Sequence, residues 1–558
     1  MRNALPLIAV LLLSAALRLW GIAFGLPHTE ARPDESTVIY IALRALVFDF
    51  HPASLVYPTG YTYLLSGIYA VYGFLSQYFS SGAGAQPLLR EYACSPSALF
   101  LINRLLAAAF GVATVYVVYK TALEWLGRRA GLAAGFFMAC CYLHVRDSHF
   151  GTLDVPMAFF ISASVLFIAR WRNAPTVFNY VCAGLLAGFA TGTKYAGILL
   201  AAHGLASHLA LAASRQELPR FLRDRRLWLF QFALLAGFFI STPDAFLDFR
   251  QLSADFSYHK NLHGVMHGSN LWHHIAFSLN YGLGLPMLLA GFAGMLWCAL
   301  KKWREFLAIF PFAVIYFAAA DKVSSGYVRY AIPLLPFFCL ASAMVYEELA
   351  VRVVWKPRLS RVFLLLLLCM LPLYNSLRLD SLMCRPDTRN EAALAAEKLL
   401  PDGATVGMLC GLYGCPLLTW DAGFYAARGA QALKQDNVFK AGLYSALDSC
   451  RASAGVPRYS KADYDAATGS FYSLSGKPMR PEWVVVAASG LKNIDALPPG
   501  AGTLLREYEP VFSIEGGGRS AQALYDQEDA FYLPYSGFAG VSAPGPDLSF
   551  LRLRRAQR

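Results

Sequence analysis

Charge is what this sequence has least of. Only 15% of its 558 residues are Asp, Glu, Lys or Arg, against about 25% in an average soluble protein. Hydrophobic residues make up 56% of the chain, which excludes a soluble globular enzyme or a disordered chain for most of the length. Apolar stretches of near-spanning length recur from Ala4 to Leu379, and they predict a polytopic α-helical membrane protein.

Hydropathy predicts about eleven spans. The predicted segments are 5–26, 97–122, 130–145, 153–170, 177–192, 195–213, 227–242, 280–300, 304–320, 328–347 and 361–379. Basic residues such as Arg170, Lys301 and Lys302 gather in alternate short links, which places the N-terminus in the cytoplasm and the C-terminal third outside. The net charge of +12 therefore follows from topology, and no basic stripe predicts nucleic-acid binding.

The N-terminal third of the membrane region contains a long link. The first segment has no small-x-small cleavage pattern before Arg18, so it is interpreted as an uncleaved anchor. A span at 62–79 would put Arg128 outside, so 27–96 is predicted to be a large outer loop whose apolar pieces lie along the membrane surface. Residues 38–47 have helical apolar spacing, typical of an amphipathic juxtamembrane helix or of a helix packed on protein.

The composition becomes mixed from Asp380 onward, and residues 380–558 are predicted to form an extracytoplasmic α/β domain beside the membrane domain 1–379. Within it, residues 388–400 are predicted to be a helix capped by Asp387 or Thr388, and 404–410 and 483–488 to be strands.

The sequence has 11 cysteines. Five fall in the parts predicted to lie outside the cytoplasm: Cys94, Cys384, Cys410, Cys415 and Cys450. One or two disulfides are expected there, because this compartment allows oxidation. The spacing of Cys410 and Cys415 excludes a C-x-x-C redox motif, and no histidine pattern completes a zinc site with them.

Two acidic motifs occur in predicted outer links. The first is Arg32-Pro33-Asp34-Glu35, which a helix start with acids in its first turn would also explain. The second runs from His144 through Arg146, Asp147 and His149 to Asp154 and Pro156. Capping would need only one of its acids, and charge so near the bilayer is by default a functional-site hypothesis.

The predicted topology puts Asp34, Glu35 and Asp154 on the same outer face, although these acids were not used to derive it. Carboxylates on one face could share a metal or an acceptor hydroxyl, with one of them as base. Lys194 and Arg329 are cations on that face, and they suit a phosphate. The alternatives are a snorkelling Lys194 and an Arg329 anchored at the headgroups.

Histidines cluster in the loop 243–280. They are His259, His263, His267, His273 and His274. The first three are spaced four residues apart and would align on a helix as a metal site, but Gly264 and Gly268 weaken that helix, and an ordinary loop helix is the expectation.

At these motifs the chain resembles the GT-C glycosyltransferases of the family 39 type, which include protein O-mannosyltransferases and lipid A aminoarabinose transferases. The similar residues are Asp34-Glu35, Tyr57-Pro58-Thr59-Gly60-Tyr61, Arg146-Asp147-Ser148-His149, Asp154-Val155-Pro156, Gly192-Thr193-Lys194-Tyr195, Arg329-Tyr330, Asp387-Thr388-Arg389 and Gly545-Pro546. The resemblance implies a GT-C-like fold of about 11–13 transmembrane helices.

The resemblance also implies a reaction. A hexosyl or pentosyl group would pass from a polyprenyl-phosphate donor to a hydroxyl of a glycan, lipid or protein acceptor, by inverting displacement outside the plasma (inner) membrane. Asp34 would be the base, and Glu35 and Asp154 would orient the acceptor or help bind a divalent metal. Lys194, Arg329 and Tyr330 would hold the lipid phosphate. Family members differ in their need for a metal, so Asp34 and Asp154 stay open as ligands.

Two other functions remain. A transporter or flippase of lipid-linked sugars would carry its charges near the bilayer midplane and show inverted repeats, and the sequence has neither. A polymerase or ligase of surface polysaccharide would also use lipid-linked sugars outside the cytoplasm, and the Asp34-Glu35 pair favours the family 39 type over it.

Overall fold

A computed structural model describes residues 4–47, 54–79, 88–212, 214–262, 270–320, 326–352 and 357–554. The chain forms two compact units. Unit 1 consists of Met1–Ile22, Phe48–Gly67 and Asn103–Leu379, and unit 2 of Ala23–Val47, Ile68–Ile102 and Asp380–Arg558. Unit 2 thus takes in two segments of the predicted outer loop as well as the C-terminal third, and each unit is described by itself.

Unit 1 is helical. Its helices are α1 (Leu5–Leu19), α6 (Arg128–Cys140), α7 (Tyr142–Asp147), α8 (Asp154–Ala169), α9 (Val177–Thr193), α10 (Leu200–Leu209), α11 (Leu218–Leu222), α12 (Arg225–Ser241), α13 (Asp244–Leu247), α14 (Phe249–Leu262), α15 (Asn270–His273), α16 (Asn280–Leu283), α17 (Leu285–Lys301), α18 (Trp303–Ile309), α19 (Pro311–Ala320), α20 (Leu335–Arg352), most of α5 (Ser97–Leu126) and most of α21 (Pro357–Met383).

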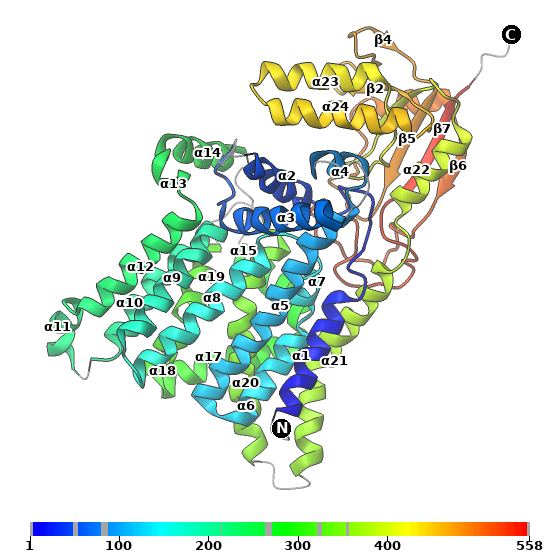
Figure 1. Cartoon of the computed structure of the whole chain (residues 1–558). Coiled ribbons are helices and arrows are strands. Elements are labelled where there is room, and N and C mark those ends of the chain that lie inside the picture. Colours follow the sequence, from blue (N-terminus) through cyan, green and yellow to red (C-terminus); the bar gives the residue numbers. More distant parts are fainter. Residues whose placement is uncertain are drawn as a thin grey trace. The chain divides into compact units, whose positions relative to one another are not determined.

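Close packing in unit 1 depends on small residues. α9 packs along both α8 and α12, and α17 packs along α20 (Figure 1). A Cβ on Gly188 of α9 would lie 2.6 Å from the backbone nitrogen of Phe238 and 2.7 Å from the Cα of Gly237 in α12. Small residues at such contacts let helix backbones approach each other, as is common between membrane helices.

Each predicted span contains a helix, but few of these helices are long. Within the described residues, four helical runs are long and apolar enough to cross a membrane alone: Ser97–Leu126, Asp154–Arg172, Val328–Arg352 and Arg358–Leu399. Two bent pairs, Asn270–Leu283 with Leu285–Lys301 and Trp303–Ile309 with Pro311–Ala320, raise this number to six. The fold class of a polytopic helical membrane protein is therefore confirmed, and the number of eleven spans stays a prediction.

Two predicted spans end or break early. α1 stops at Leu19, not at residue 26, because Gly21 follows with a φ of 89°, which is outside the helical region. The span 130–145 is broken at Cys141, whose backbone is extended. The Arg18 guanidinium donates to the Met138 and Ala139 carbonyls, at 3.3 and 3.2 Å, and so satisfies acceptors at the end of α6.

The predicted outer loop is mostly helical. It contains α2 (Glu35–Leu46), α3 (Gly60–Phe79) and α4 (Leu88–Cys94), and α3 is not among the candidate spans. The apolar face of α2 packs on protein, as one of the two interpretations of residues 38–47 predicted, because Val38, Ile39, Ala42 and Leu43 are buried. On another side of the helix, Tyr40 contacts Asn437 and Phe439 of the same unit. A position of α2 or α3 along the membrane surface stays a prediction.

Unit 2 is built on a seven-stranded mixed sheet of order β4-β3-β2-β1-β5-β7-β6. The strands are β1 (Thr405–Leu409), β2 (Ser460–Asp465), β3 (Ser470–Tyr472), β4 (Pro478–Met479), β5 (Trp483–Ala488), β6 (Tyr508–Ile514) and β7 (Asp547–Leu553). The two predicted strands, β1 and β5, are central parallel neighbours, with Val406 opposite Trp483. Its other helices are α22 (Thr388–Leu399), α23 (Ala422–Lys434), α24 (Val438–Ser453) and α25 (Ala501–Leu504).

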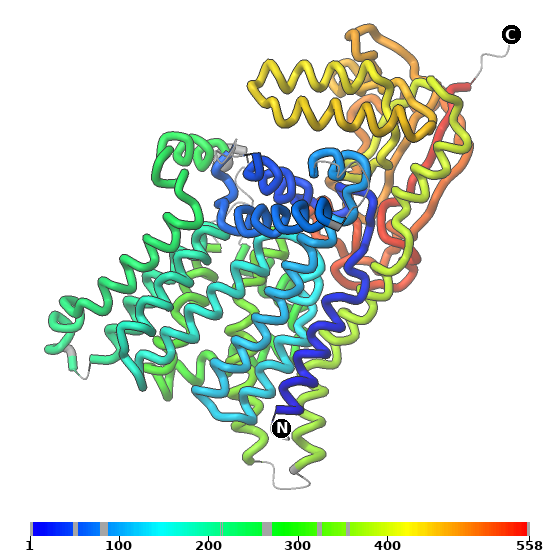
Figure 2. Tube along the Cα trace, in the orientation of Figure 1, coloured from blue at the N-terminus to red at the C-terminus, as the bar shows by residue number. Residues whose placement is uncertain are grey.

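Side-chain and covalent links hold unit 2 together. Asp387 caps α22 as predicted, accepting from the Arg389 backbone N–H at 3.0 Å, and the same two side chains form a fully buried ion pair. α23 and α24 form a hairpin, drawn in yellow in Figure 2. Disulfides join Cys94 of α4 to Cys450 of α24, and Cys410 to Cys415, which agrees with the two bridges that the predicted compartment allows.

Candidate functional site

An Asp–Lys ion pair lies in unit 1 where three segments meet. Asp154 is the first residue of α8. Lys194 has an extended backbone and separates α9 from the 3₁₀ turn Tyr195–Leu199. The Lys194 Nζ lies 2.5 Å from Asp154 Oδ1. The Asp154 side chain is only 4% exposed and that of Lys194 is 23% exposed. The helix dipole favours an acid such as Asp154 in the first turn. The Asp154 carboxylate pairs with Lys194, however, and does not cap the helix.

The third segment is the 3₁₀ helix Val328–Leu334, which carries the predicted Arg329 and Tyr330. The Lys194 Nζ lies 4.8 Å from the Tyr330 ring centroid, within cation–π range. The Tyr316 hydroxyl donates to the Tyr330 carbonyl at 2.9 Å, which fixes the backbone there. Arg329 is buried, with its guanidinium 4.7 Å from the centroid of Tyr327. The structure therefore brings Asp154, Lys194 and Tyr330 together, with Arg329 next to Tyr330 along the chain.

Glycine and hydroxyl contacts hold the Lys194 turn in place. A Cβ on Gly60 would lie 2.6 Å from the Gly192 carbonyl, and the Thr242 hydroxyl donates to that carbonyl at 3.3 Å. Thr59 donates through its hydroxyl to the Ser241 carbonyl at 3.0 Å. Two of the motifs predicted from sequence, 57–61 and 192–195, thus pack against each other.

Asn103 was not predicted as a site residue, yet it links the first of these motifs to the start of α8. Its amide donates to the Gly151 carbonyl at 3.0 Å, and its oxygen accepts from the Tyr61 hydroxyl at 2.8 Å. A Cβ on Gly151 would collide with the Asn103 side chain. An amide inside an apolar 30-residue helix was the signal that could have revealed it.

The other residues of the motifs that carry the resemblance, which are expected to support the site, have mainly structural contacts. Arg146 and Asp147 form a fully buried ion pair at 2.9 Å. Both ring nitrogens of His149 lie near backbone carbonyls, those of Val145 at 2.9 Å and Trp20 at 3.1 Å. Tyr195 donates to the Leu55 carbonyl at 2.6 Å, and Tyr57 is half-buried.

Asp34 and Glu35 lie in unit 2, at the start of α2. Asp34 occupies the N-cap position, but its side chain makes no capping hydrogen bond and its φ is 72°. A non-glycine residue in this left-handed region is strained, and such strain gathers at functional sites. The buried Arg32–Asp529 ion pair, 2.8 Å long, holds the preceding turn, and Glu35 is fully buried. A helix does begin at this motif with Glu35 in its first turn, as the alternative explanation predicted, but the Asp34 side chain does not cap it.

A metal centre has little support among the residues that the structure describes. No group of three or more His, Cys, Asp or Glu side chains gathers there as ligands. Asp154, one proposed ligand, is paired with Lys194. His263 and His267 lie outside the described residues, and His259 is described only in its backbone, so the alternative of aligned imidazoles is not tested. His274 is hydrogen-bonded with Ser278 at 3.0 Å.

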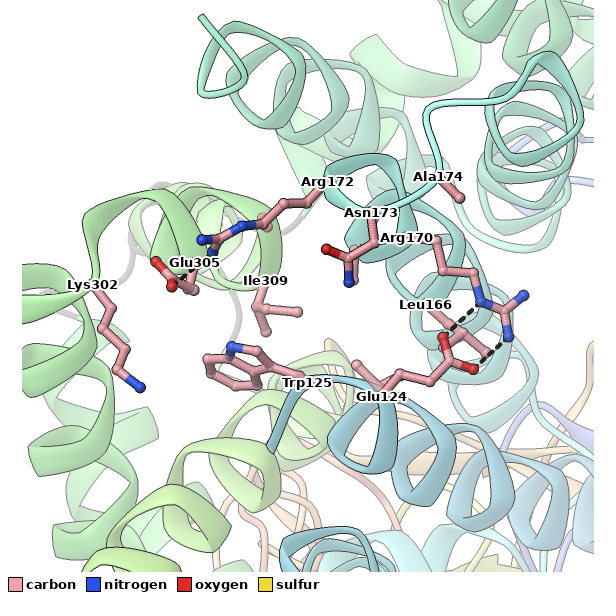
Figure 3. A pocket seen from close by; sticks show the side chains of 13 residues that line it. Glu124, Trp125, Leu166, Arg170, Arg172, Asn173, Ala174, Lys302, Glu305 and Ile309 are labelled. Carbon is pink, nitrogen blue, oxygen red and sulfur yellow. Dashed lines mark hydrogen bonds and ion pairs between the residues drawn. The ribbon is translucent and has the colours of Figure 1, made fainter. Parts of the chain in front are cut away.

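A separate cavity of about 660 Å³ lies at the other end of α8. Figure 3 shows Arg170 bound through two hydrogen bonds to Glu124, and Arg172 beside Glu305. α8 has 16 residues, so Asp154 is about 24 Å from this end at the usual helical rise. The cavity is therefore distinct from the Asp154–Lys194 site.

Comparison with known proteins shows that part of this polytopic membrane protein is similar to a family of glycosyltransferases. Residues 100–242 match the sequence model of a family described as dolichyl-phosphate-mannose-protein mannosyltransferase. This match confirms the predicted resemblance to protein O-mannosyltransferases over that segment. It contains Asp154 and Lys194 but neither Asp34 nor Arg329. No curated protein matches the sequence.

Solved structures of three other proteins are similar to this chain at low identity. The Archaeoglobus fulgidus oligosaccharyltransferase in its apo form is 14% identical with a TM-score of 0.47, over 72% of this chain and 58% of that one. ArnT from Cupriavidus metallidurans bound to undecaprenyl phosphate is 14% identical with a TM-score of 0.49, over 97% of both chains. The S. cerevisiae Pmt1-Pmt2 complex bound to the sugar donor is 18% identical with a TM-score of 0.33, over 45% of this chain and 34% of that one.

Proposed function

We propose that this membrane glycosyltransferase moves a hexosyl or pentosyl group from a polyprenyl-phosphate donor to an acceptor hydroxyl on the extracytoplasmic face of the plasma (inner) membrane. The observation that carries the proposal is the meeting of Asp154, Lys194 and Tyr330 at one place in unit 1. A lysine presents three donors, and Asp154 occupies one of them, so the others serve a phosphate.

The reaction is a single inverting displacement. The acceptor oxygen forms a bond to the anomeric carbon, and the bond from that carbon to the phosphate oxygen breaks. The acceptor proton passes to the Asp34 carboxylate, and the lipid phosphate leaves with the bonding electron pair. Lys194 and Arg329 neutralise the charge that develops on this phosphate, which is where electrostatic catalysis acts. Asp154 positions Lys194, and Glu35 orients the acceptor.

The test is transfer of radiolabelled sugar from short polyprenyl-phosphate donors by the purified full chain, with membrane extract as acceptor. Wild type is compared with Lys194→Ala, and the control is Lys301→Ala, an exposed lysine at the end of α17. Label should move with wild type and the control and be nearly lost with Lys194→Ala. Equal turnover by Lys194→Ala would make Lys194 a snorkelling residue.

Asp34→Asn tests the base. The substitution keeps the size of the side chain, and asparagine tolerates the left-handed backbone, so folding should stay near that of wild type. We expect transfer to be abolished while donor binding persists, measured by the same assay and by donor-dependent thermal stabilisation. Wild-type turnover would show that Asp34 is not the base.

The same assay separates the other functions. Detergent removes compartments, so a flippase gives no transferred label, although a lipid-linked sugar still stabilises it thermally. Label that accumulates only on long polysaccharide would indicate a polymerase or ligase. Hydrolysis of the donor without a labelled acceptor product would support the proposed donor class, and the acceptor would then have to be identified separately.

A further inference from the structure

Unit 2 contains a cavity of about 510 Å³ whose walls come from distant parts of the chain. Its lining includes the turn before α2, α4, α22 and the α23–α24 hairpin. The Cys94–Cys450 disulfide links α4 to α24 directly at this lining. A volume in this range is typical of small-molecule sites that are largely formed before binding.

Aliphatic and aromatic side chains make up most of the wall. Its aromatic rings are Tyr92, Trp420, Phe424, Tyr425 and Tyr444. The Trp420 and Phe424 centroids lie 5.8 Å apart, and Lys461 lies over both rings, at 5.9 and 5.5 Å. These contacts fix the orientation of the two rings, so the wall offers aromatic faces that are ordered before a ligand arrives.

The polar groups of the cavity include acceptors and donors. Glu30 and Glu397 contribute carboxylates, which can only accept hydrogen bonds when ionised, and Arg451 contributes guanidinium donors. Asn390, Thr29 and the tyrosine hydroxyls of the lining add groups that can donate. His28 does not supply a charge, because burial and the nearby Arg389 lower its pKa to about 4. Its Nδ1 accepts from the Glu30 N–H at 3.2 Å and its Nε2 contacts the Cys415 carbonyl at 2.9 Å, as a neutral ring does.

Aromatic faces with carboxylates between them suit one kind of ligand. A sugar ring has apolar C–H faces that pack on aromatic rings and a rim of hydroxyl or amino groups that donate to carboxylates. Each hydroxyl of the ring can also accept, and Arg451 and Asn390 can donate to it. Aromatic faces flanked by acceptors and donors therefore favour a sugar, and a peptide is the alternative that the experiment below tests.

The cavity also lies close to the proposed base. Glu30 is four residues before Asp34 in the sequence. The Ser36 hydroxyl, two residues after Asp34, donates to the Glu30 carboxylate at 3.3 Å. Burial raises the pKa of the Glu30 carboxyl, and the charges of Asp34 and Glu35 add to that rise. A ligand held against Glu30 is thus near the carboxylate that is proposed to take the acceptor proton.

We infer that this cavity binds the acceptor and that the acceptor presents a sugar ring there. This inference rests on the proposed glycosyltransferase function and narrows its acceptor to a glycan or glycolipid headgroup. Tyr444 and Trp420 stack on the ring, and Glu397 and Glu30 accept from its hydroxyl or amino groups.

The experiment measures binding and turnover separately on the full chain in detergent. Methyl glycosides, amino-sugar disaccharides and a serine- and threonine-rich peptide are titrated while tryptophan fluorescence is followed. The variants are Glu397→Gln and Tyr444→Ala, and the matched control is Glu391→Gln, an exposed acid on the same helix but outside the cavity lining.

We expect at least one saccharide to bind, with affinity about tenfold weaker in Glu397→Gln because a hydrogen bond to a charged group is lost. Affinity in Tyr444→Ala should also fall, and Glu391→Gln should bind like wild type. Donor-dependent thermal stabilisation should be the same in all four proteins. Binding of the peptide alone, no saccharide binding at millimolar concentration, or equal binding by every variant would overturn the inference. Saccharide binding without sugar transfer from any donor would instead contradict the proposed function.

Discussion

The two ends of α8 carry the same kind of interaction in different settings. At its start, Asp154 pairs with Lys194 and is 4% exposed. After its last turn, Arg170 pairs with Glu124, and the two side chains are 29% and 33% exposed. Exposed pairs contribute about 0–1 kcal/mol, because water already solvates both charges. A buried carboxylate that loses its cation destabilises the folded protein. The Asp154–Lys194 pair is therefore the one whose presence calls for a functional explanation.

The largest effect is expected from Lys194→Ala, which removes the cation paired with Asp154 at the start of α8, called here the buried end of that helix. Loss of one preorganised donor to a developing negative charge typically lowers kcat by about 10²- to 10³-fold. Sugar transfer at saturating acceptor should fall by that factor, measured with the radiolabelled donor. A loss of protein stability without a loss of turnover per folded molecule would reduce the pair to a structural contact.

Asp154→Asn should have a smaller effect, because the cation stays and only its positioning partner loses charge. Losing a hydrogen bond between charged groups costs about 1.5–3 kcal/mol. If Asp154 acts through Lys194, the double variant Asp154→Asn/Lys194→Ala will be no slower than Lys194→Ala alone, as a double-mutant cycle can show. Additive losses would instead give Asp154 a role of its own with the substrate.

Sequence reasoning found the two ionised residues of the buried end, because charges beside apolar segments stand out. It missed Asn103, since one amide near the start of an apolar helix resembles an ordinary helix residue. The break at Cys141 could not be predicted either, because no Pro or Gly marks it and the Arg18 contacts that support it come from another helix.

The division of the chain into two units could be predicted only in part from the sequence. The break after Leu379 coincides with a visible change in composition, but the grouping of 23–47 and 68–102 with the C-terminal third does not. That grouping depends on long-range contacts such as Cys94–Cys450 and Arg32–Asp529, whose partners are hundreds of residues away. The hydropathy of 27–96 contains no sign of them.

Gly151→Ala tests the support of the buried end without changing a charge. Its Cβ would collide with the Asn103 side chain, and overpacking of this kind costs about 1–3 kcal/mol. Thermal unfolding in detergent should show a clear loss of stability, together with reduced turnover if the start of α8 shifts. Gly67→Ala is the control, since a Cβ there meets open space, and in a helix it should be neutral or stabilising.

The smallest effect is expected from Glu124→Gln at the exposed end. The substitution removes the partner of Arg170 in the cavity of Figure 3, but water can replace a carboxylate that is one-third exposed. Stability should change by less than about 1 kcal/mol, and added salt should reduce the difference further. Transfer activity should equal that of wild type, because this end lies a helix length from Lys194. A large loss of activity in Glu124→Gln would show that the two ends of α8 are coupled. The exposed Arg170–Glu124 pair would then take part in the same mechanism as the buried Asp154–Lys194 pair.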